Sequence, residues 1–390
     1  MIAGIIGATG YAGAELARLL SGHPKLEKLL LSSVSFEGDR IENVYPNFLG
    51  RISAALLKPE EVVHEADLVF AALPSGVGEG FAKTAVERKI PFIDLSADFR
   101  FDDDEETFRA WYGKGYVHPE LREFSVYGLP ELNRKRIREL AAAGPVIIGN
   151  PGCYPTGASL GLFPALAKGL AASGAGPVIV NSVSGITGGG REPQRSFHFP
   201  ECSDSVSPYK VGAHRHTPEI SRNMEIMAGE AGAKLSGVPE VPLHDSPPET
   251  KLHEPSLVFT PHLAPMNRGI LSTIYIPLKK DAGIHEGRPR PPAAGVETLA
   301  GKIRQLYLDF YRDEPFVRIL PAGLYAATNR VRQSNYCDIS VHLDHGGSML
   351  IIVSAIDNMV KGAAGQAVQN MNIVMDFEEN SGLAAIPALF

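Results

Sequence analysis

The chain has 390 residues, of which 44% are hydrophobic and 21% are charged, and its formal net charge is −7. This length and composition suit two domains that each bury a core, and the negative charge, with no cluster of Lys and Arg, argues against a nucleic-acid partner. No apolar run is long enough to cross a membrane and no signal peptide is evident, so a cytoplasmic protein is expected, and the three scattered cysteines fit neither a disulfide framework nor a metal site.

Short apolar runs alternate with helical periodicity in the first half of the chain, which is typical of βαβ units around a parallel sheet. The predicted strands are Ile2–Ile6, Leu29–Ser33, Leu68–Leu73, Pro91–Leu95 and Val146–Gly149. A helix is predicted from about Tyr11, and a last one from Asp357 to Met375 that packs back on this half. The pattern is that of an α/β fold with a Rossmann-type dinucleotide-binding domain made of residues 1–152 and 357–390.

The character of the chain changes after residue 152, where strand-like runs follow one another with few helices between them. These runs are Val178–Val183, Leu257–Pro261, Ile270–Leu278, Tyr336–Leu343 and Met349–Ser354. They predict a second, α+β domain over residues 153–356 with a mostly antiparallel sheet. Two Pro-rich stretches, 238–255 and 280–295, are predicted to be surface loops.

A glycine-rich turn with the spacing G-x-x-G-x-x-G lies between the first strand and the first helix. In this context backbone N–H groups at a helix N-terminus can receive a pyrophosphate, although a tight turn without a ligand is the alternative. The second strand ends in small hydroxyl residues without a carboxylate, which favours NADP(H) over NAD, with Arg40 as a candidate cation. The candidate cofactor contacts are Gly7, Thr9, Gly10, Tyr11, Ala12, Gly13, Ser32 and Ser33, with Pro74 and Ser75 in the loop after the third strand.

Cys153 follows a predicted strand and a Pro-Gly turn, and Pro155 and Thr156 then lead into an apolar helix predicted over Ala158–Leu170, so the cysteine lies at the mouth of a helix. Unpaired N–H groups and the positive end of the helix dipole lower a thiol pKa at such a place, and they can also stabilise an oxyanion. The alternative is a buried, inert thiol. We expect that inert role for Cys337, inside a strand, and a loop thiol for Cys202. Cys153 is therefore the candidate nucleophile.

A cysteine nucleophile needs a group that moves a proton, and the segment His214-Arg215-His216 offers two. Thr217 is predicted to be the N-cap of a helix, which places both histidines on the turn before it. Glu219 is a candidate to orient one imidazole. The sequence leaves open which histidine faces the cysteine.

Arginines and a second glycine-rich run complete the candidate site. Gly185 and Gly188 lie in the run that ends at Arg191, where small residues allow a ligand to approach the backbone, and a plain surface loop is the alternative. Arginine forks bind carboxylate and phosphate oxygens in pairs, but each could equally form a surface ion pair. The candidate substrate contacts are Arg100, Asn150, Arg191 and Arg215.

These blocks resemble, in order and over nearly the whole chain, those of N-acetyl-γ-glutamyl-phosphate reductase. They are Gly-Ala-Thr-Gly-Tyr-Ala-Gly at 7–13, Ser-Ala-Asp-Phe-Arg at 96–100, Tyr-Gly-Leu-Pro-Glu at 127–131, Asn-Pro-Gly-Cys-Tyr-Pro-Thr at 150–156, the loop ending at Arg191, His-Arg-His-Thr-Pro-Glu at 214–219, Pro-Met-Asn-Arg-Gly-Ile-Leu at 265–271 and Ile-Asp-Asn-Met-Val-Lys-Gly at 356–362. The Pro-rich stretches look longer than is usual in that family.

The resemblance implies an NADPH-dependent reduction of N-acetyl-L-glutamyl 5-phosphate to the 5-semialdehyde, a step of arginine biosynthesis. It implies a thioester on Cys153, a nicotinamide near Asn358, and catalytic and oligomerisation roles for the second domain of a homodimer or homotetramer. Three alternatives remain at this point: aspartate-β-semialdehyde dehydrogenase, a reductase of an aminoadipate-type acyl phosphate, and a non-catalytic NADP(H)-binding sensor. Neither a membrane nor a metal is implied.

Overall fold

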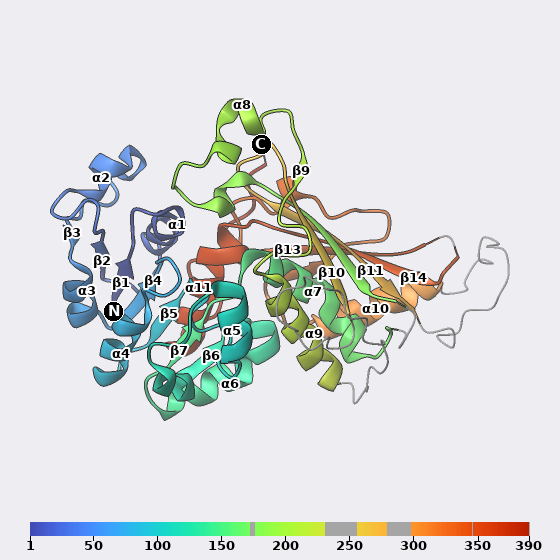
Figure 1. Ribbon diagram of the computed structural model, residues 1–390, viewed down its shortest axis with the longest axis horizontal. Coiled ribbons are helices and arrows are strands. Elements are labelled where there is room, and N and C mark those ends of the chain that lie inside the picture. The colour runs from blue at the N-terminus through green and yellow to red at the C-terminus, as the bar shows by residue number, and fades with distance from the viewer. Residues whose placement is uncertain (172–175, 231–255, 279–297, 345, 390) are drawn as a thin grey trace.

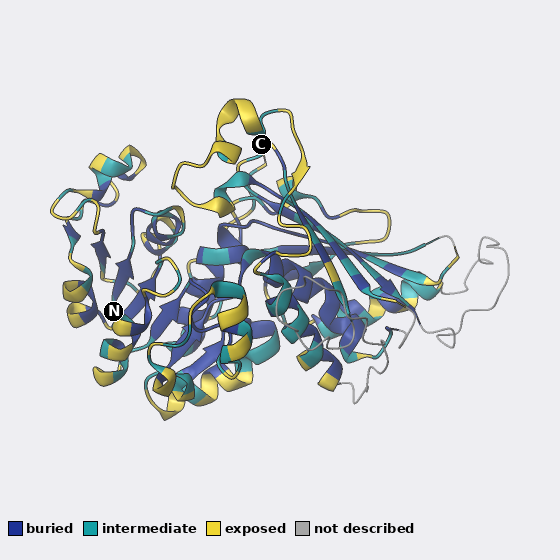
Figure 2. Cartoon of the chain, viewed as in Figure 1, coloured by how far each residue is buried: buried dark blue, intermediate teal, exposed yellow. Residues whose placement is uncertain are grey.

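The computed structural model describes residues 1–171, 176–230, 256–278, 298–344 and 346–389. The two Pro-rich stretches, 238–255 and 280–295, lie outside the described residues. Two sheets form two domains that lie side by side (Figure 1). The dark blue residues of Figure 2 show that the cores lie along both sheets and under the helices that cover them.

The first sheet is parallel and belongs to residues 1–149. In spatial order its described strands are β3 (Leu56–Leu57), β2 (Lys28–Ser32), β1 (Ile2–Ile6), β4 (Leu68–Ala71), β5 (Phe92–Asp94), β7 (Ile147–Gly149) and β6 (Ser125–Tyr127). The five predicted strands are confirmed to within two residues at each end. The sequence analysis missed β3 and β6, because two or three residues at the edges of a sheet carry too little periodicity to be recognised.

Helices cover both faces of this sheet (Figure 1). They are α1 (Tyr11–Leu20), α2 (Ile41–Val44), α3 (Pro59–Glu65), α4 (Glu79–Glu87), α5 (Glu105–Tyr112), α6 (Pro130–Ala143) and α11 (Gly365–Val374), with 3-10 turns at Pro46–Phe48 and Pro119–Phe124. The C-terminal α11 packs against α1 and α6, as predicted, and its Val368 and Met371 are fully buried in that core. A π-helical turn, Val360–Ala364, precedes α11 and brings the chain back from the second domain.

The second sheet is mixed. In spatial order its described strands are β12 (Val317–Ile319), β13 (Cys337–Leu343), β14 (Met349–Ile356), β11 (Ile270–Pro277), β8 (Val178–Ser184), β10 (Leu257–Leu263) and β9 (Ser207–Pro208). The pairs β13–β14, β14–β11, β11–β8 and β10–β9 are antiparallel, and β8–β10 and β12–β13 are parallel. The predicted strands and the mostly antiparallel character are confirmed.

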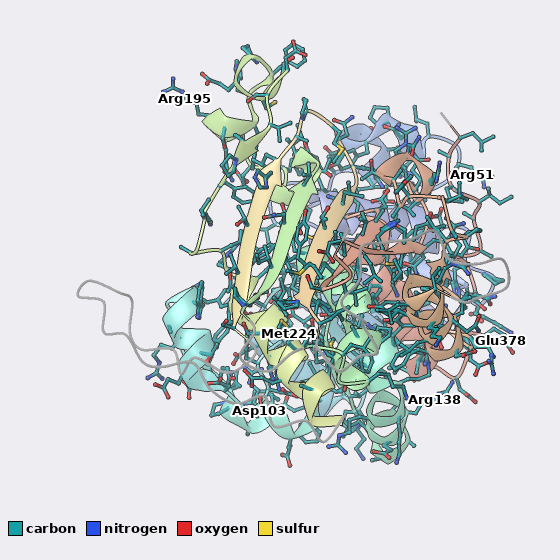
Figure 3. The ribbon with its side chains drawn as sticks, turned by 90° about the vertical axis from the view of Figure 1, so that its right-hand side faces the viewer. Arg51, Asp103, Arg138, Arg195, Met224 and Glu378 are labelled. Carbon is teal, nitrogen blue, oxygen red and sulfur yellow. The ribbon has the colours of Figure 1, made fainter. Side chains whose placement is uncertain are left out.

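One face of the second sheet is covered by helices. They are α7 (Cys153–Ala167), α9 (Thr217–Glu230) and α10 (Leu299–Phe310), while α8 (Phe199–Cys202) and the 3-10 turns Ile186–Gly189, Arg195–Phe197 and Thr328–Arg330 lie in connecting segments. Residues of β11 alternate between buried and half-buried, so one side of the strand faces α7. In the side view of Figure 3, α9 with Met224 lies beside these strands, and Met224 is fully buried. The described helices and strands include no helix long and apolar enough to cross a membrane.

Candidate active site

Cys153 is the first residue of α7 and follows β7 through the turn Asn150-Pro151-Gly152. Gly152 is extended at the N-cap, with φ −66° and ψ 153°, and its carbonyl accepts the amide hydrogen of Thr156 at 3.0 Å. A side chain cannot replace its hydrogen, because a Cβ there would lie 2.6 Å from Nε2 of His216. The glycine therefore lets an imidazole approach the backbone directly before the cysteine.

A buried carboxylate fixes this turn. Oε1 of Glu219 accepts hydrogen bonds from the Gly152 amide and the Tyr127 hydroxyl, both at 2.8 Å. Oε2 of Glu219 faces Nη1 of Arg100 at 3.3 Å, and the two side chains are 1% and 9% exposed. Glu219, expected to orient an imidazole, thus holds the backbone of the cysteine turn instead.

Arg100, expected to clamp substrate oxygens, is engaged within the protein. Its Nε donates to the carbonyl of Asn150 at 2.8 Å and its Nη2 to that of Leu95 at 3.0 Å. Asn150, also a candidate substrate contact, donates from Nδ2 to the carbonyl of Ala363 at 3.1 Å. These contacts join the end of β5, the cysteine turn and the π-helical turn, so Arg100 and Asn150 position the nucleophile.

Replacing Glu219 with glutamine should lower the free energy of unfolding by about 3 to 5 kcal/mol, because it leaves the buried Arg100 guanidinium without its counter-charge. The matched control is Glu201→Gln, since Glu201 pairs with Arg195 at 3.4 Å in a pair whose side chains are 49% and 89% exposed. Such surface pairs contribute about 1 kcal/mol or less. Urea unfolding of both variants measures the difference, and equal stability would contradict a structural role for the Arg100–Glu219 pair.

The two histidines lie at the start of α9, within a cluster of aromatic rings. The helix begins at Thr217, one residue earlier than predicted, and the Ile220 amide donates to the His216 carbonyl at 3.0 Å, so His216 and not Thr217 is the capping residue. The rings of His214 and His216 are 4.8 Å apart, and the His216 amide donates to Nδ1 of His214 at 3.1 Å. Tyr154, next to the nucleophile, is 5.8 Å from His216 between ring centres.

His216 is the histidine nearer the cysteine turn. A Cβ at Gly152 would lie 2.6 Å from its Nε2, and its Nδ1 is buried without a hydrogen-bond partner among the described residues. His214 packs its ring against Tyr209, Tyr154 and Phe259, at 5.3, 5.4 and 5.5 Å between ring centres. The geometry thus distinguishes two residues that the sequence could not.

Burial disfavours the charged forms of the Cys153 thiol and of both imidazoles. Burial raises the pKa of Cys153 to about 11, although the charge of Arg100 and the helix amides act to lower it. The expectation of a depressed thiol pKa is therefore wrong for this site, because desolvation outweighs the helix N-terminus. Burial also lowers the pKa of His214 to about 4, and burial with the neighbouring charges lowers that of His216 well below its usual value. An uncharged imidazole next to the cysteine turn has a ring nitrogen, unpartnered among the described residues, that can accept a proton.

The glycine-rich turn has the geometry of a dinucleotide cradle. Gly7 has φ +83°, a conformation that favours glycine, and a Cβ at Gly13 would collide with the Gly7 carbonyl oxygen. Thr9 and Ser33 share a hydrogen bond between their hydroxyls at 2.7 Å, which ties the turn to the end of β2. The Ser32 hydroxyl is buried without a partner among the described residues. The turn and the strand end thus fit a nucleotide whose ribose meets hydroxyls and no carboxylate.

Two buried carboxylates, Asp94 and Asp98, lie near the loop that contains Pro74 and Ser75. The sequence analysis did not single them out. Asp98 accepts the Gly76 amide at 2.7 and 2.8 Å, and the Ala97 amide donates to the Ser75 hydroxyl at 3.2 Å. Burial, and next the charge of Asp98, raises the pKa of Asp94 to about 7. Asp98 belongs to the Ser-Ala-Asp-Phe-Arg block, so that block was the available signal.

Asn358 connects the second glycine-rich run to the rest of the site. Its Nδ2 donates to the Thr187 hydroxyl at 3.0 Å, and its Oδ1 accepts the Gly269 amide at 2.8 Å. A Cβ at Gly188 would lie 3.6 Å from the Asn358 Nδ2, and one at Gly185 would lie 2.6 Å from the Asn267 carbonyl oxygen. The run is therefore a 3-10 turn held in place by these contacts rather than a plain loop.

The two remaining candidate arginines lie in different places. Arg215 is exposed between the histidines, 5.6 Å from the ring centre of Tyr112, whose hydroxyl donates to the Arg215 carbonyl at 3.3 Å. Arg191, which was grouped with the substrate contacts, donates from Nη1 to the Thr9 carbonyl at 3.0 Å. The structure thus brings Arg215 to the histidine segment and Arg191 to the dinucleotide turn.

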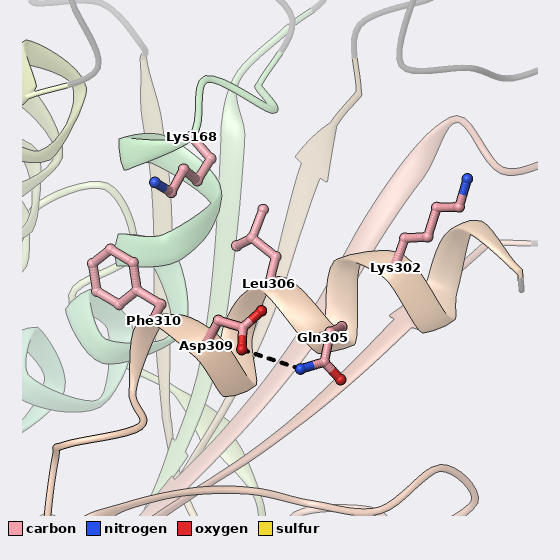
Figure 4. A pocket seen from close by; sticks show the side chains of 6 residues that line it. All are labelled: Lys168, Lys302, Gln305, Leu306, Asp309 and Phe310. Carbon is pink, nitrogen blue, oxygen red and sulfur yellow. Dashed lines mark hydrogen bonds between the residues drawn. The ribbon is translucent and has the colours of Figure 1, made fainter.

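A hollow of about 490 Å³ lies at the opposite end of α7 from Cys153 (Figure 4). It is lined by Lys168, Lys302, Gln305, Leu306, Asp309 and Phe310. Gln305 donates to Asp309 at 3.2 Å along one face of α10. No group of three or more His, Cys, Asp and Glu side chains in the described ranges could hold a metal ion.

Comparison with known proteins gives two family matches. Residues 2–140 match the family described as "Semialdehyde dehydrogenase, NAD binding domain", and residues 153–358 match "Semialdehyde dehydrogenase, dimerisation domain". Among curated proteins, the chain is 46% identical over 387 residues to N-acetyl-gamma-glutamyl-phosphate reductase of Clostridium kluyveri and 45% identical to that of Clostridium beijerinckii, each match covering 99% of both chains. The enzyme of that name from Brachyspira hyodysenteriae is 42% identical, again over 99% of both chains.

Solved structures share the fold at low sequence identity. Aspartate semialdehyde dehydrogenase II of Vibrio cholerae aligns with a TM-score of 0.65 at 14% identity, and the match covers 96% of this chain and 98% of that one. Aspartate semialdehyde dehydrogenase of Candida albicans, solved with NADP, aligns with a TM-score of 0.59 at 18% identity, with 96% and 98% covered. At these identities the likeness establishes the two-domain architecture alone.

Proposed function

The chain belongs to the semialdehyde dehydrogenase family and, within it, to the N-acetyl-gamma-glutamyl-phosphate reductases, and from this premise we propose that it reduces N-acetyl-L-glutamyl 5-phosphate to N-acetyl-L-glutamate 5-semialdehyde and phosphate. The observation that carries the proposal is the placement of Cys153 at the start of α7, with His216 against the preceding glycine. Such a reaction is a step of arginine biosynthesis, and we place it in the cytoplasm.

The first half of the reaction is an acyl transfer to sulfur. Sγ of Cys153 attacks the acyl phosphate carbonyl while the neutral His216 imidazole accepts the thiol proton. The N–H groups at the start of α7 stabilise the oxyanion of the tetrahedral intermediate. The C–O bond to phosphate then breaks, phosphate leaves, and the acyl group remains as a thioester on Cys153.

The second half reduces the thioester. A nicotinamide bound between the domains would supply the hydride. Hydride addition to the thioester carbon would leave an oxyanion, and when this collapses to the aldehyde the C–S bond breaks and the proton held by His216 returns to sulfur. Arg215, exposed between the histidines, is placed to bind an anionic group of the substrate, whereas Arg100, Asn150 and Glu219 keep the cysteine turn in position.

The cofactor site favours NADP(H). The Gly7–Gly13 turn, Ser32 and Ser33 would hold the adenosine half, and the loop with Pro74 and Ser75, together with the Asn358 turn, would hold the nicotinamide half. The end of β2 carries hydroxyls and no carboxylate, so nothing there repels a 2′-phosphate. Gly185 packs against the Asn267 backbone and Gly188 lies beside Asn358, so this run would border the nicotinamide half of the cofactor.

The reverse reaction tests substrate and cofactor together. With phosphate and NADP, the enzyme should oxidise N-acetyl-glutamate semialdehyde, and NAD should give a kcat/KM about 10- to 100-fold lower, because charged contacts to the 2′-phosphate are lost. Aspartate semialdehyde and aminoadipate semialdehyde are the controls. Equal rates with NADP and NAD would contradict the cofactor proposal, and a preference for either control aldehyde would contradict the substrate.

We also propose a homodimer formed through the second domain. Among the described residues, α7, α9 and α10 cover one face of its sheet (Figure 1), Ala326 and Val331 pack on part of the other face, and the half-buried positions of β8 and β11 alternate with the buried ones. Half-buried apolar side chains on such a face, including Ile179 and Tyr275, suit contact with a second copy.

A further inference from the structure

Arg191 crosses from the second domain to the dinucleotide turn of the first. It follows the 3-10 turn Ile186–Gly189, and its Nη1 donates to the Thr9 carbonyl at 3.0 Å. The guanidinium carbon lies 5.4 Å from the ring centre of Phe36 and 5.2 Å from that of Tyr45. The Tyr45 hydroxyl donates to the same carbonyl at 3.0 Å. Two rings and one carbonyl thus hold this cation in a defined place.

That place adjoins the expected position of the adenosine ribose. In dinucleotide-binding folds the residue at the end of the second strand contacts the ribose 2′ position. Here Ser33 follows β2, and its hydroxyl is hydrogen-bonded to that of Thr9, the residue whose carbonyl Arg191 contacts. Thr9 therefore contacts both the Arg191 guanidinium and Ser33, at the end of β2 that would face the ribose.

The charge of Arg191 is not neutralised by the protein. Arg191 is exposed, and within the described ranges it forms no ion pair with a carboxylate; the Thr9 carbonyl accepts one of its five N–H donors. Arg40, the cation that the sequence suggested for this role, is occupied: its Nε donates to Glu42 at 2.7 Å and its Nη2 contacts the Ser53 hydroxyl. An unpaired cation beside hydroxyls, where a carboxylate is missing, suits a phosphate ligand.

We propose that Arg191 binds the 2′-phosphate of NADP(H) and is the main determinant of preference for NADP(H) over NAD(H). The inference rests on the proposed use of NADP(H) and adds the residue responsible. Because the arginine comes from the second domain, the 2′-phosphate would be held between the two domains. The loop that carries it also contains Thr187, which is hydrogen-bonded to Asn358, so the phosphate contact is joined to the nicotinamide end of the crevice.

Calorimetric binding of two adenosine fragments tests this without turnover. Adenosine 2′,5′-bisphosphate and adenosine 5′-monophosphate differ by the 2′-phosphate alone, so the ratio of their dissociation constants isolates that contact. In Arg191→Ala we expect the affinity for the bisphosphate to fall about 10- to 100-fold, while the monophosphate changes much less. Arg191→Lys, which keeps the charge and loses the fork, should fall in between. Arg40→Ala is the matched control and should keep the wild-type ratio.

The outcomes separate this inference from the function on which it rests. If the wild-type enzyme prefers the bisphosphate and Arg191→Ala keeps that preference, another residue binds the 2′-phosphate and the inference is wrong. If Arg40→Ala loses the preference instead, the inference is equally wrong. If the wild-type enzyme shows no preference for the bisphosphate, the NADP(H) proposal itself fails. Retained binding of the monophosphate by Arg191→Ala shows that the variant is folded.

Discussion

Replacing Cys153 with serine should lower kcat by about 10⁴-fold or more, because the serine hydroxyl is a far weaker nucleophile and forms no thioester. The side chain is nearly isosteric, so NADPH binding should be unchanged. Steady-state rates in the phosphate-dependent direction measure the loss. Intact-mass analysis should show an acyl adduct on the wild-type enzyme and none on the variant.

Cys202→Ser is the matched control for that substitution. Cys202 ends the short helix α8, and its sulfur lies 3.7 Å from the carbonyl oxygen of Phe197, away from the cysteine turn. Its replacement should leave kcat close to the wild-type value. Cys337 is a less suitable control, because it is fully buried in β13 and burial raises its pKa far above the usual range. Wild-type activity in Cys153→Ser would remove the basis of the proposed mechanism.

Replacing His216 with glutamine should lower kcat by about 10²- to 10⁴-fold with little change in KM, because the amide can form hydrogen bonds but cannot accept the thiol proton. The effect depends on the pKa of Cys153, which burial raises to about 11, so that the thiol form dominates at neutral pH and a base is needed. The loss should shrink as the pH rises toward that value, since the thiolate then forms without help. A pH profile of kcat for both enzymes measures this convergence.

His214→Gln is the control for His216→Gln. His214 accepts the amide hydrogen of His216 and packs against Tyr209, so its loss should disturb the position of His216 and lower kcat by about 10-fold at most. A larger loss in His214→Gln than in His216→Gln would transfer the proton-accepting role to His214. Equal profiles at every pH for wild type and His216→Gln would exclude proton transfer by His216 altogether.

The position of the cysteine was predictable because it depends on local signals. A strand, a Pro-Gly turn and an apolar helix place Cys153 at a helix start, and the structure has the helix begin at that residue. The same holds for the dinucleotide turn. The spacing of its glycines is required because Gly7 and Gly13 lie so close to neighbouring backbone atoms that a side chain would not fit. Long strands with clear periodicity were predicted to within two residues, whereas the short strands β3, β6, β9 and β12 and helix α10 were not predicted.

The sequence by itself determined the two-domain α/β architecture, the family and the position of the candidate nucleophile, because each rests on residues adjacent in the chain or on ordered blocks. Only the tertiary structure decided the ionisation of the thiol, since burial is a property of all that packs around Cys153 and here it outweighs the helix N-terminus. It also decided which charged residues act together. Glu219 meets Arg100 from 119 residues away and Arg191 meets Thr9 from 182 residues away. Side chains so far apart in sequence meet only when the two domains pack against each other, and no local sequence pattern encodes that contact.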